Sequence, residues 1–217
     1  MKKHFLISIL LALFAVGVIS VNAKASITIA TFDDPSAGSS DPLFTVDFTL
    51  MKLTGGWADA KPGVTLVTPY GTYEDVWFEM GDVTITGTAT VPGVGKFGYV
   101  GSGTINFYAN NTLVSPLVTI GFENSLVSRY GFDGSDETPD GDIVSTNVTI
   151  TGSVIPYALS NEQFSFSFAN LTKLPDHTSF NDGFTATAAF TSSAEIPEPA
   201  TLCLLGLGAL NLIRRKK

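Results

Sequence analysis

Carboxylates gather in one short segment of this chain, residues 132–142. Five of these eleven residues are acidic, and two glycines and a proline among the others favour a loop that folds back on itself. Clustered carboxylates on a turn are oxygen ligands of the kind that Ca²⁺ prefers, although their spacing differs from that of an EF-hand. The sequence leaves two interpretations open, a solvated acidic loop or a structural Ca²⁺ site formed by Asp133, Asp136, Asp140 and Asp142.

Two tryptophans offer a second kind of chemistry, the stacking of aromatic rings on sugars. Trp57 follows a Gly-Gly pair, and strand alternation would place Trp77 on one face with Tyr73, Asp75 and Glu79. Exposed rings beside carboxylates suit a carbohydrate-binding module, in which Ca²⁺ would order the acidic loop. The competing interpretation places both indole rings in the core, since large aromatic side chains are mostly buried.

The sequence offers few residues that are suited to catalysis. His177 is the only histidine after His4 and lies in a stretch that reads as a loop, so a multi-histidine zinc site is excluded there. A Ser-His-Asp arrangement lacks the usual Gly-x-Ser-x-Gly turn. Asp75 and Glu79, four residues apart on a strand, would be about 13 Å apart, whereas glycosidase carboxylates are about 5 to 9.5 Å apart. We therefore expect no enzymatic activity, with a secreted hydrolase as the weakest alternative.

Charge and cysteine content limit the partners further. All 20 acidic residues fall between Asp33 and Glu198 together with five basic ones, which gives this region a net charge of −15, against −8 for the whole chain. Such a charge repels phosphate backbones, so we expect no nucleic-acid partner. The single cysteine, Cys203, lies near the C-terminus, so no disulfide can form within the region upstream.

Short runs of alternating apolar and polar residues fill the centre of the chain. In residues 43–50, Phe44, Val46, Phe48 and Leu50 alternate with polar residues, which is the period of a half-buried strand. Turn-forming clusters separate nine such runs, at 43–50, 63–67, 73–80, 83–91, 97–108, 113–122, 143–154, 163–170 and 184–191. The pattern predicts an all-β domain over residues 26–191, an antiparallel sandwich of jelly-roll type, followed by a linker at 192–196.

The N-terminus has the parts of a secretory signal peptide. Lys2 and Lys3 precede the mostly apolar residues 5–21, and small residues at Ala23 and Ala25 occupy the positions that signal peptidase inspects. The sequence predicts a signal peptide over residues 1–25 and cleavage before Ser26. The alternatives are cleavage after Ala23 or an uncleaved anchor helix.

The C-terminus has its own order of parts. Pro197, Glu198 and Pro199 are followed by an apolar run at residues 202–213 and by four basic residues, Arg214, Arg215, Lys216 and Lys217. As a helix, residues 200–213 would span about 21 Å, short of a hydrocarbon core of about 30 Å. The terminal charges are typical of a cytoplasmic stop, although a simple tail anchor or a buried helix are alternatives.

These three parts resemble the PEP-CTERM sorting signal of Gram-negative bacteria. The resemblance covers residues 196–217 and rests on the motif Pro197-Glu198-Pro199, the short apolar helix and the basic end; the two terminal lysines depart from the arginines that the family favours. It implies recognition by an exosortase-like membrane enzyme and transient insertion in the inner membrane. It also implies sorting to the cell envelope or surface, in a setting of exopolysaccharide, extracellular matrix or biofilm, with polysaccharide as a possible partner.

Overall fold

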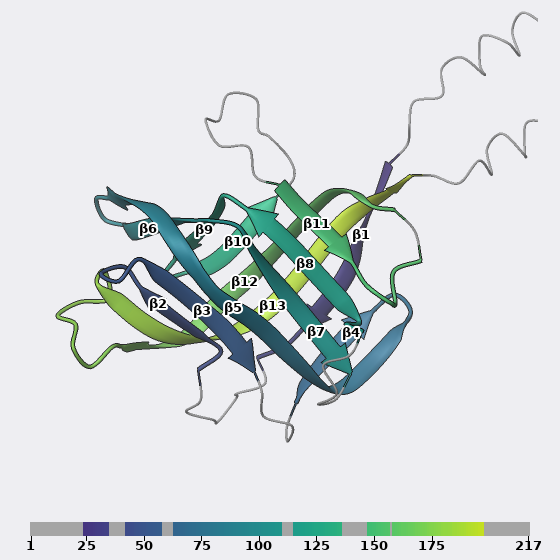
Figure 1. Cartoon of the computed structure of the whole chain (residues 1–217), viewed down its shortest axis with the longest axis horizontal. Helices are drawn as coiled ribbons and strands as arrows, with labels where there is room; N and C mark the ends of the chain where they lie inside the picture. Colours follow the sequence, from purple (N-terminus) through teal and green to yellow (C-terminus); the bar gives the residue numbers. More distant parts are fainter. Residues whose placement is uncertain are drawn as a thin grey trace, which may run out of the picture. The chain divides into compact units, whose positions relative to one another are not determined.

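Antiparallel strands make up the part of the chain that the computed structural model describes (Figure 1), residues 24–34, 42–57, 63–109, 115–135, 147–156 and 158–197. Within those ranges there is no helix. The described ranges therefore include no helix that is long and apolar enough to cross a membrane. Most of the predicted signal peptide, the acidic loop from residue 136 and the tail from Glu198 lie outside the described residues.

Thirteen strands follow one another along the chain. They are β1 (Lys24–Phe32), β2 (Phe44–Asp47), β3 (Lys52–Trp57), β4 (Val64–Thr68), β5 (Gly71–Val91), β6 (Gly95–Val100), β7 (Gly103–Ala109), β8 (Val118–Glu123), β9 (Ser125–Ser128), β10 (Gly131–Ser135), β11 (Asn147–Thr151), β12 (Ser160–Lys173) and β13 (Gly183–Pro197). The all-β, antiparallel class predicted from the alternation is confirmed.

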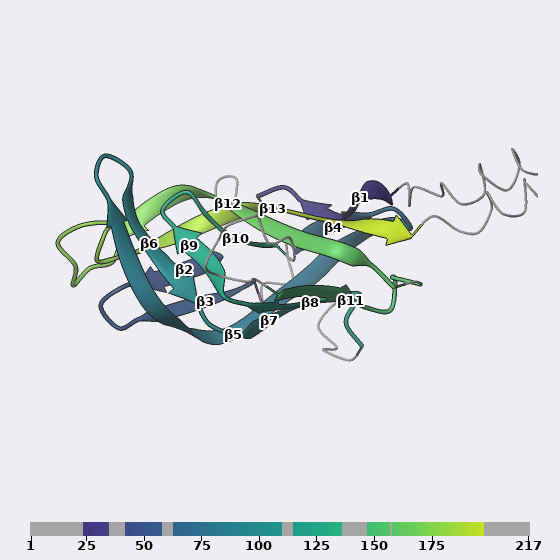
Figure 2. The same ribbon diagram turned by 90° about the horizontal axis from the view of Figure 1, so that it is seen from above.

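The strands form one continuous sheet that closes on itself. β5, β3, β2, β13, β12, β10, β9 and β6 are hydrogen bonded in this order, and β6 pairs back with β5. β6 pairs with residues 85–91 of β5, whereas β7 pairs with residues 76–80 and is followed in the sheet by β8 and β11. β1 pairs with β13 and β4, and β4 pairs in turn with β5. Seen from above, β12 and β13 lie over β5, β7 and β8, so two layers of the same sheet face each other (Figure 2).

Phenylalanine rings fill the space between these layers. Phe166 of β12 is fully buried and stacks on Phe78 of β5 at 5.6 Å between centroids. Its ring also lies 4.7 Å from Phe190 of β13 and 4.9 Å from Phe44 of β2. Because the buried apolar side chains of the described residues all lie in the unit Ser26–Glu195, this unit contains its own core and can fold by itself.

Several strand boundaries differ from the alternation. The runs at 73–80 and 83–91 are one strand, β5, and the run at 97–108 is divided at Gly101 into β6 and β7. The alternation missed β1, β3, β9 and β10. Leu50, predicted on the buried side, is 73% exposed, because the Asp47 carboxylate accepts hydrogen bonds from the Thr49 and Leu50 amides and closes a turn there.

Candidate functional site

The last strand reaches into the predicted sorting signal. β13 ends at Pro197, so the linker predicted at 192–196 is wrong: Ser192 and Ala194 are buried, and Glu195 pairs with Ser160 of β12. Pro197 is thus the last residue of a strand. Glu198, Pro199 and the basic stop at Arg214, Arg215, Lys216 and Lys217 lie outside the described residues.

The other end of the chain is described only from Lys24. Ala25, beside the predicted signal-peptidase site, falls within β1, whereas Ala23 lies outside the described residues. The compact unit begins at Ser26, the residue expected to follow the cleavage. The site of cleavage stays a prediction.

Asp133 is the one predicted Ca²⁺ ligand that the structure describes. It lies on β10, opposite Ser165 of β12, and not on a loop. Desolvation raises the pKa of its carboxyl above the ordinary range. Asp136, Asp140 and Asp142 lie outside the described residues, and elsewhere in the described part of the chain no three His, Cys, Asp or Glu side chains gather as metal ligands.

A bulge in β5 decides which side chains share the outer face with Trp77. Asp75 has φ of 55°, and the register between β4 and β5 shifts between Val64 and Leu66. Tyr73 is consequently opposite Leu66 and packs against the core, so its predicted place beside Trp77 is wrong. Glu79, two residues after Trp77 on the regular part of the strand, points outward with it.

Trp77 and Glu79 begin a mixed aromatic and polar face across β5, β7 and β8. Trp77 lies directly opposite Tyr108, and Glu79 lies opposite Asn106. The Asn106 Oδ1 accepts a hydrogen bond from the Thr119 hydroxyl at 2.9 Å, which continues the polar row onto β8. Desolvation and the nearby Glu79 carboxylate raise the pKa of Tyr108, while within the described part of the chain the buried Trp77 Nε1 has no hydrogen-bond partner.

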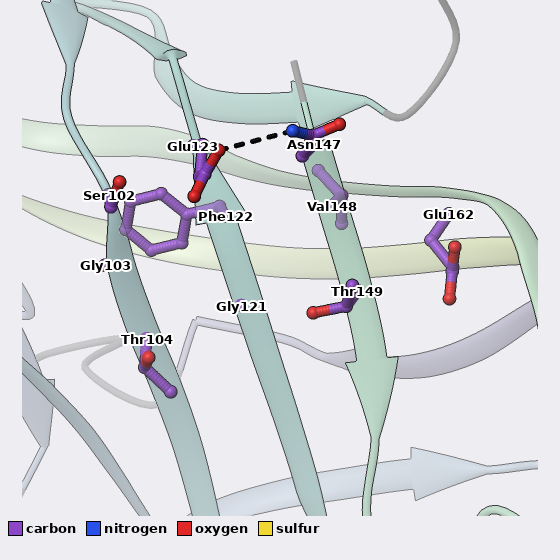
Figure 3. A pocket seen from close by; sticks show the side chains of 10 residues that line it. All are labelled: Ser102, Gly103, Thr104, Gly121, Phe122, Glu123, Asn147, Val148, Thr149 and Glu162. Carbon is purple, nitrogen blue, oxygen red and sulfur yellow. Dashed lines mark hydrogen bonds between the residues drawn. The ribbon is translucent and has the colours of Figure 1, made fainter.

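A hollow of about 670 Å³ lies beside this face, at the first residues of β7 and β11 and the last residues of β8. Thr104 lies two residues from Asn106 on β7, and Thr149 faces Gly121 across β8 and β11 (Figure 3). At the rim, the Glu123 Oε2 accepts a hydrogen bond from the Asn147 side-chain Nδ2 at 3.2 Å. Hydroxyl, amide and carboxylate groups therefore extend the face beyond the two rings, and none of the described residues that line the hollow is basic.

Trp57 belongs to the core instead. Its side chain is 5% exposed, on β3 opposite Phe78. The buried interpretation therefore holds for Trp57, and Trp77 lies at the surface between Tyr108 and the bulge.

His177 lies in the connection between β12 and β13, as the sequence predicts, but it is not solvated. Its Nε2 is 3.2 Å from the Asp47 Oδ1, and both side chains are only 12% exposed. Burial by itself would raise the pKa of Asp47, but the Leu50 amide, His177 and the Thr49 amide outweigh it and hold the pKa below the ordinary range. The pair ties two turns together, while Asp176, the neighbouring carboxylate in sequence, is exposed.

Sequence reasoning missed Tyr108 and Asn106 as members of the outer face. The run at 97–108 contained both, but nothing in it indicates that β7 pairs with the bulged half of β5. Alternation along residues 43–50 puts Asp47 on the polar side of a strand, but it does not indicate that this carboxylate contacts His177.

The comparison with known proteins found a match for the C-terminal tail only. Residues 195–217 match the protein-family model described as the PEP-CTERM protein-sorting motif. No curated protein matches the chain, and no solved structure does. The match begins at Glu195, so the motif overlaps the end of β13. This chain therefore carries a PEP-CTERM sorting motif and is an exported protein that an exosortase sorts to the cell envelope or surface.

Proposed function

We propose that this protein is a non-enzymatic component of the cell surface or extracellular matrix, made in connection with exopolysaccharide or biofilm. The PEP-CTERM motif at residues 195–217 is the observation that carries the proposal. In this proposal a Gram-negative cell removes residues 1–25, residues 202–213 insert transiently in its inner membrane, and Arg214 to Lys217 hold the end in the cytoplasm. The delivered domain is a sandwich of jelly-roll type with the charge of a soluble extracellular protein.

The absence of an activity is part of the proposal. His177 supports it, because its Nε2 contacts Asp47 while its buried Nδ1 has no hydroxyl or other hydrogen-bond partner among the described residues that it could activate as a nucleophile. A hydrolase of the Ser-His-Asp type would need His177, so an activity that disappears in His177→Ala, and not in Asp176→Ala, would contradict the proposal.

Localisation of a motif variant tests the sorting. Pro197, Glu198 and Pro199 are replaced together by alanine, with Thr201→Ala as a matched control just outside the motif. We expect the motif variant to remain in the inner membrane with its tail intact, and the control to reach the surface like the wild type. If the motif variant reaches the surface in processed form, the sorting motif does not act as proposed.

A carbohydrate-binding role is the second candidate, and the Trp77–Tyr108 pair favours it. Two rings side by side on a strand face, followed by Glu79, Asn106 and Thr119, combine stacking surface with groups that hydrogen bond to hydroxyls. The carboxylates Glu79 and Glu123, with no basic side chain among the described residues that line the hollow, favour neutral or amino-bearing sugars over acidic ones. In this proposal Ca²⁺ would bind Asp133, Asp136, Asp140 and Asp142 and order the acidic loop.

Tryptophan fluorescence separates this face from the core. In Trp57→Phe, Trp77 is the only tryptophan left, so stacking on a sugar changes an emission that comes from the face alone. We expect neutral glucans or amino-sugar polymers to shift this emission and Trp77→Ala to abolish binding, while Trp57→Phe retains it. Unchanged binding in Trp77→Ala would remove the second candidate.

A further inference from the structure

Four turns meet at one end of the Ser26–Glu195 unit, the end at the left of Figure 1. They are the β2–β3 turn (48–51), the β5–β6 turn (92–94), the β9–β10 turn (129–130) and the β12–β13 connection (174–182). The Phe48 amide donates to the Asp182 carbonyl at 2.9 Å, and the Lys96 amide donates to the Asn181 Oδ1 at 3.3 Å. The Tyr130 hydroxyl donates to the Val94 carbonyl at 3.4 Å. These contacts hold the four turns together as one surface, which we term the four-turn end.

Apolar side chains project from the tips of these turns. Five of the nine large apolar side chains that are exposed among the described residues lie here: Leu50 (73%), Tyr130 (55%), Val91 (44%), Phe180 (42%) and Val94 (37%). Turn tips in water usually carry Gly, Asn, Asp or Ser. Grouped exposed apolar side chains mark a surface that meets a protein or a membrane.

Cations surround the same tips. Every lysine and arginine whose side chain the structure describes belongs to this end: Lys52 opens β3, Lys96 lies at the start of β6, Arg129 lies in the β9–β10 turn and Lys173 closes β12. Lys52 pairs with Asp82 at 2.6 Å. Within the described part of the chain no carboxylate pairs with the other three, and the guanidinium of Arg129 lies 4.8 Å from the Tyr130 ring centroid.

The carboxylates at this end are mostly engaged. Asp47 accepts hydrogen bonds from two turn amides, Asp82 pairs with Lys52, and Asp182 accepts hydrogen bonds from Thr178 and Ser179. Asp176 is exposed. The other nine described carboxylates lie elsewhere in the unit and include Glu79, Glu123 and Glu195. The described part of the unit is therefore electrically polar, with the cations that pair with no carboxylate at the four-turn end and the excess negative charge away from it.

We propose that the four-turn end docks onto an anionic lipid surface. Apolar tips that enter the headgroup region, with lysine and arginine stems beside them, are the arrangement by which proteins bind membrane interfaces. Tyr130 and Phe180 supply rings of the kind that lie at the interface, and the unpaired cations meet the lipid phosphates. The distant carboxylates are screened over a Debye length of about 8 Å.

Vesicle binding tests the proposal on residues 26–197, which contain the self-contained unit and end with β13. We expect this segment to sediment with phosphatidylcholine vesicles that contain phosphatidylglycerol and not with phosphatidylcholine alone. Leu50→Ser/Val94→Ser/Tyr130→Ser should bind at least about tenfold more weakly, and Lys96→Gln/Arg129→Gln should lose about fivefold for each charge.

Two exposed side chains at the other end of β5 supply a matched control. Val67 and Tyr70 are each 45% exposed, beside the turn that precedes β5, and no described lysine or arginine lies in that turn. Val67→Ser/Tyr70→Ser should bind vesicles like the wild type. Melting curves of all variants show whether a loss of binding comes from a loss of fold.

A fluorescent label gives a second readout. Residues 26–197 contain no cysteine, so Val94→Cys and Val67→Cys each accept a dye at one defined position. On anionic vesicles, the label at position 94 should shift to the blue and be quenched by doxyl lipids, and the label at position 67 should do neither.

Three results would overturn the proposal. One is the absence of wild-type binding to anionic vesicles at about 0.1 M salt. A second is equal binding by the folded triple variant. The third is binding to an anionic polysaccharide, or self-association lost in the triple variant, without vesicle binding; this would assign the four-turn end to another class of partner.

Discussion

The Asp47 carboxylate stabilises the folded domain, and this contribution should weaken in acid. Its Oδ1 accepts hydrogen bonds from the Thr49 and Leu50 amides, each at 2.8 Å, and lies 3.2 Å from the His177 Nε2. Asp47→Asn retains a side-chain acceptor but removes the charge. We therefore expect the turn between β2 and β3 to keep its conformation in Asp47→Asn, but the free energy of unfolding to fall.

The magnitude follows from the hydrogen bonds involved. A hydrogen bond to a charged group contributes about 1.5–3 kcal/mol, against about 1 kcal/mol for a neutral one. With two amide donors and one histidine at stake, we expect Asp47→Asn to lower the free energy of unfolding by about 2 kcal/mol at neutral pH. In a domain of this size that corresponds to about 4–8 °C in melting temperature.

The sign of the pH dependence follows from the lowered pKa of Asp47. The folded state holds this pKa below its ordinary value of 3.8, so the carboxylate contributes its full stability above that value. The contribution is lost as pH falls through the folded pKa. The difference between wild type and Asp47→Asn should therefore be largest near neutral pH and shrink below pH 3.8.

Urea unfolding of residues 26–197 at several pH values measures both quantities, with Asp176→Asn as the control. Asp176 adjoins His177 in sequence but is exposed, so its replacement should change stability by less than about 0.5 kcal/mol. The reasoning is refuted if Asp176→Asn costs as much as Asp47→Asn, or if the cost of Asp47→Asn does not diminish in acid.

Other changes test the core and the acidic loop. Phe166→Ala, which removes a fully buried ring in contact with rings from both layers, should lower the free energy of unfolding by about 3–5 kcal/mol in the same urea assay. Gly131→Ala places a Cβ 2.4 Å from the Phe166 carbonyl oxygen, so it should destabilise the domain by more than 1 kcal/mol, and a neutral effect would contradict the β10–β12 spacing. Ca²⁺ should raise the melting temperature of the wild type and not of Asp140→Ala/Asp142→Ala; the absence of a wild-type shift would exclude the calcium site.

Features that depend only on residues close together in the chain are determined by the sequence itself. Alternation of apolar and polar residues has a period of two, which a strand requires whatever it pairs with, so the all-β class follows from local pattern. The PEP-CTERM motif is likewise an order of parts along the chain: Pro197-Glu198-Pro199, an apolar run and a basic end. An enzyme that processes a tail reads that order, so no tertiary structure is needed to recognise it.

Pairing between distant strands decided the rest. The bulge at Asp75 turned Tyr73 toward the core, against which it packs, and the register of β5 with β7 placed Trp77 beside Tyr108. His177 found Asp47, 130 residues away, and not the adjacent Asp176. Alternation specifies which side of a strand is apolar, but it does not specify which strand lies next to it or where the register slips. The aromatic face and the four-turn end exist only once the sheet has closed, because closure brings the turns and faces of distant segments together.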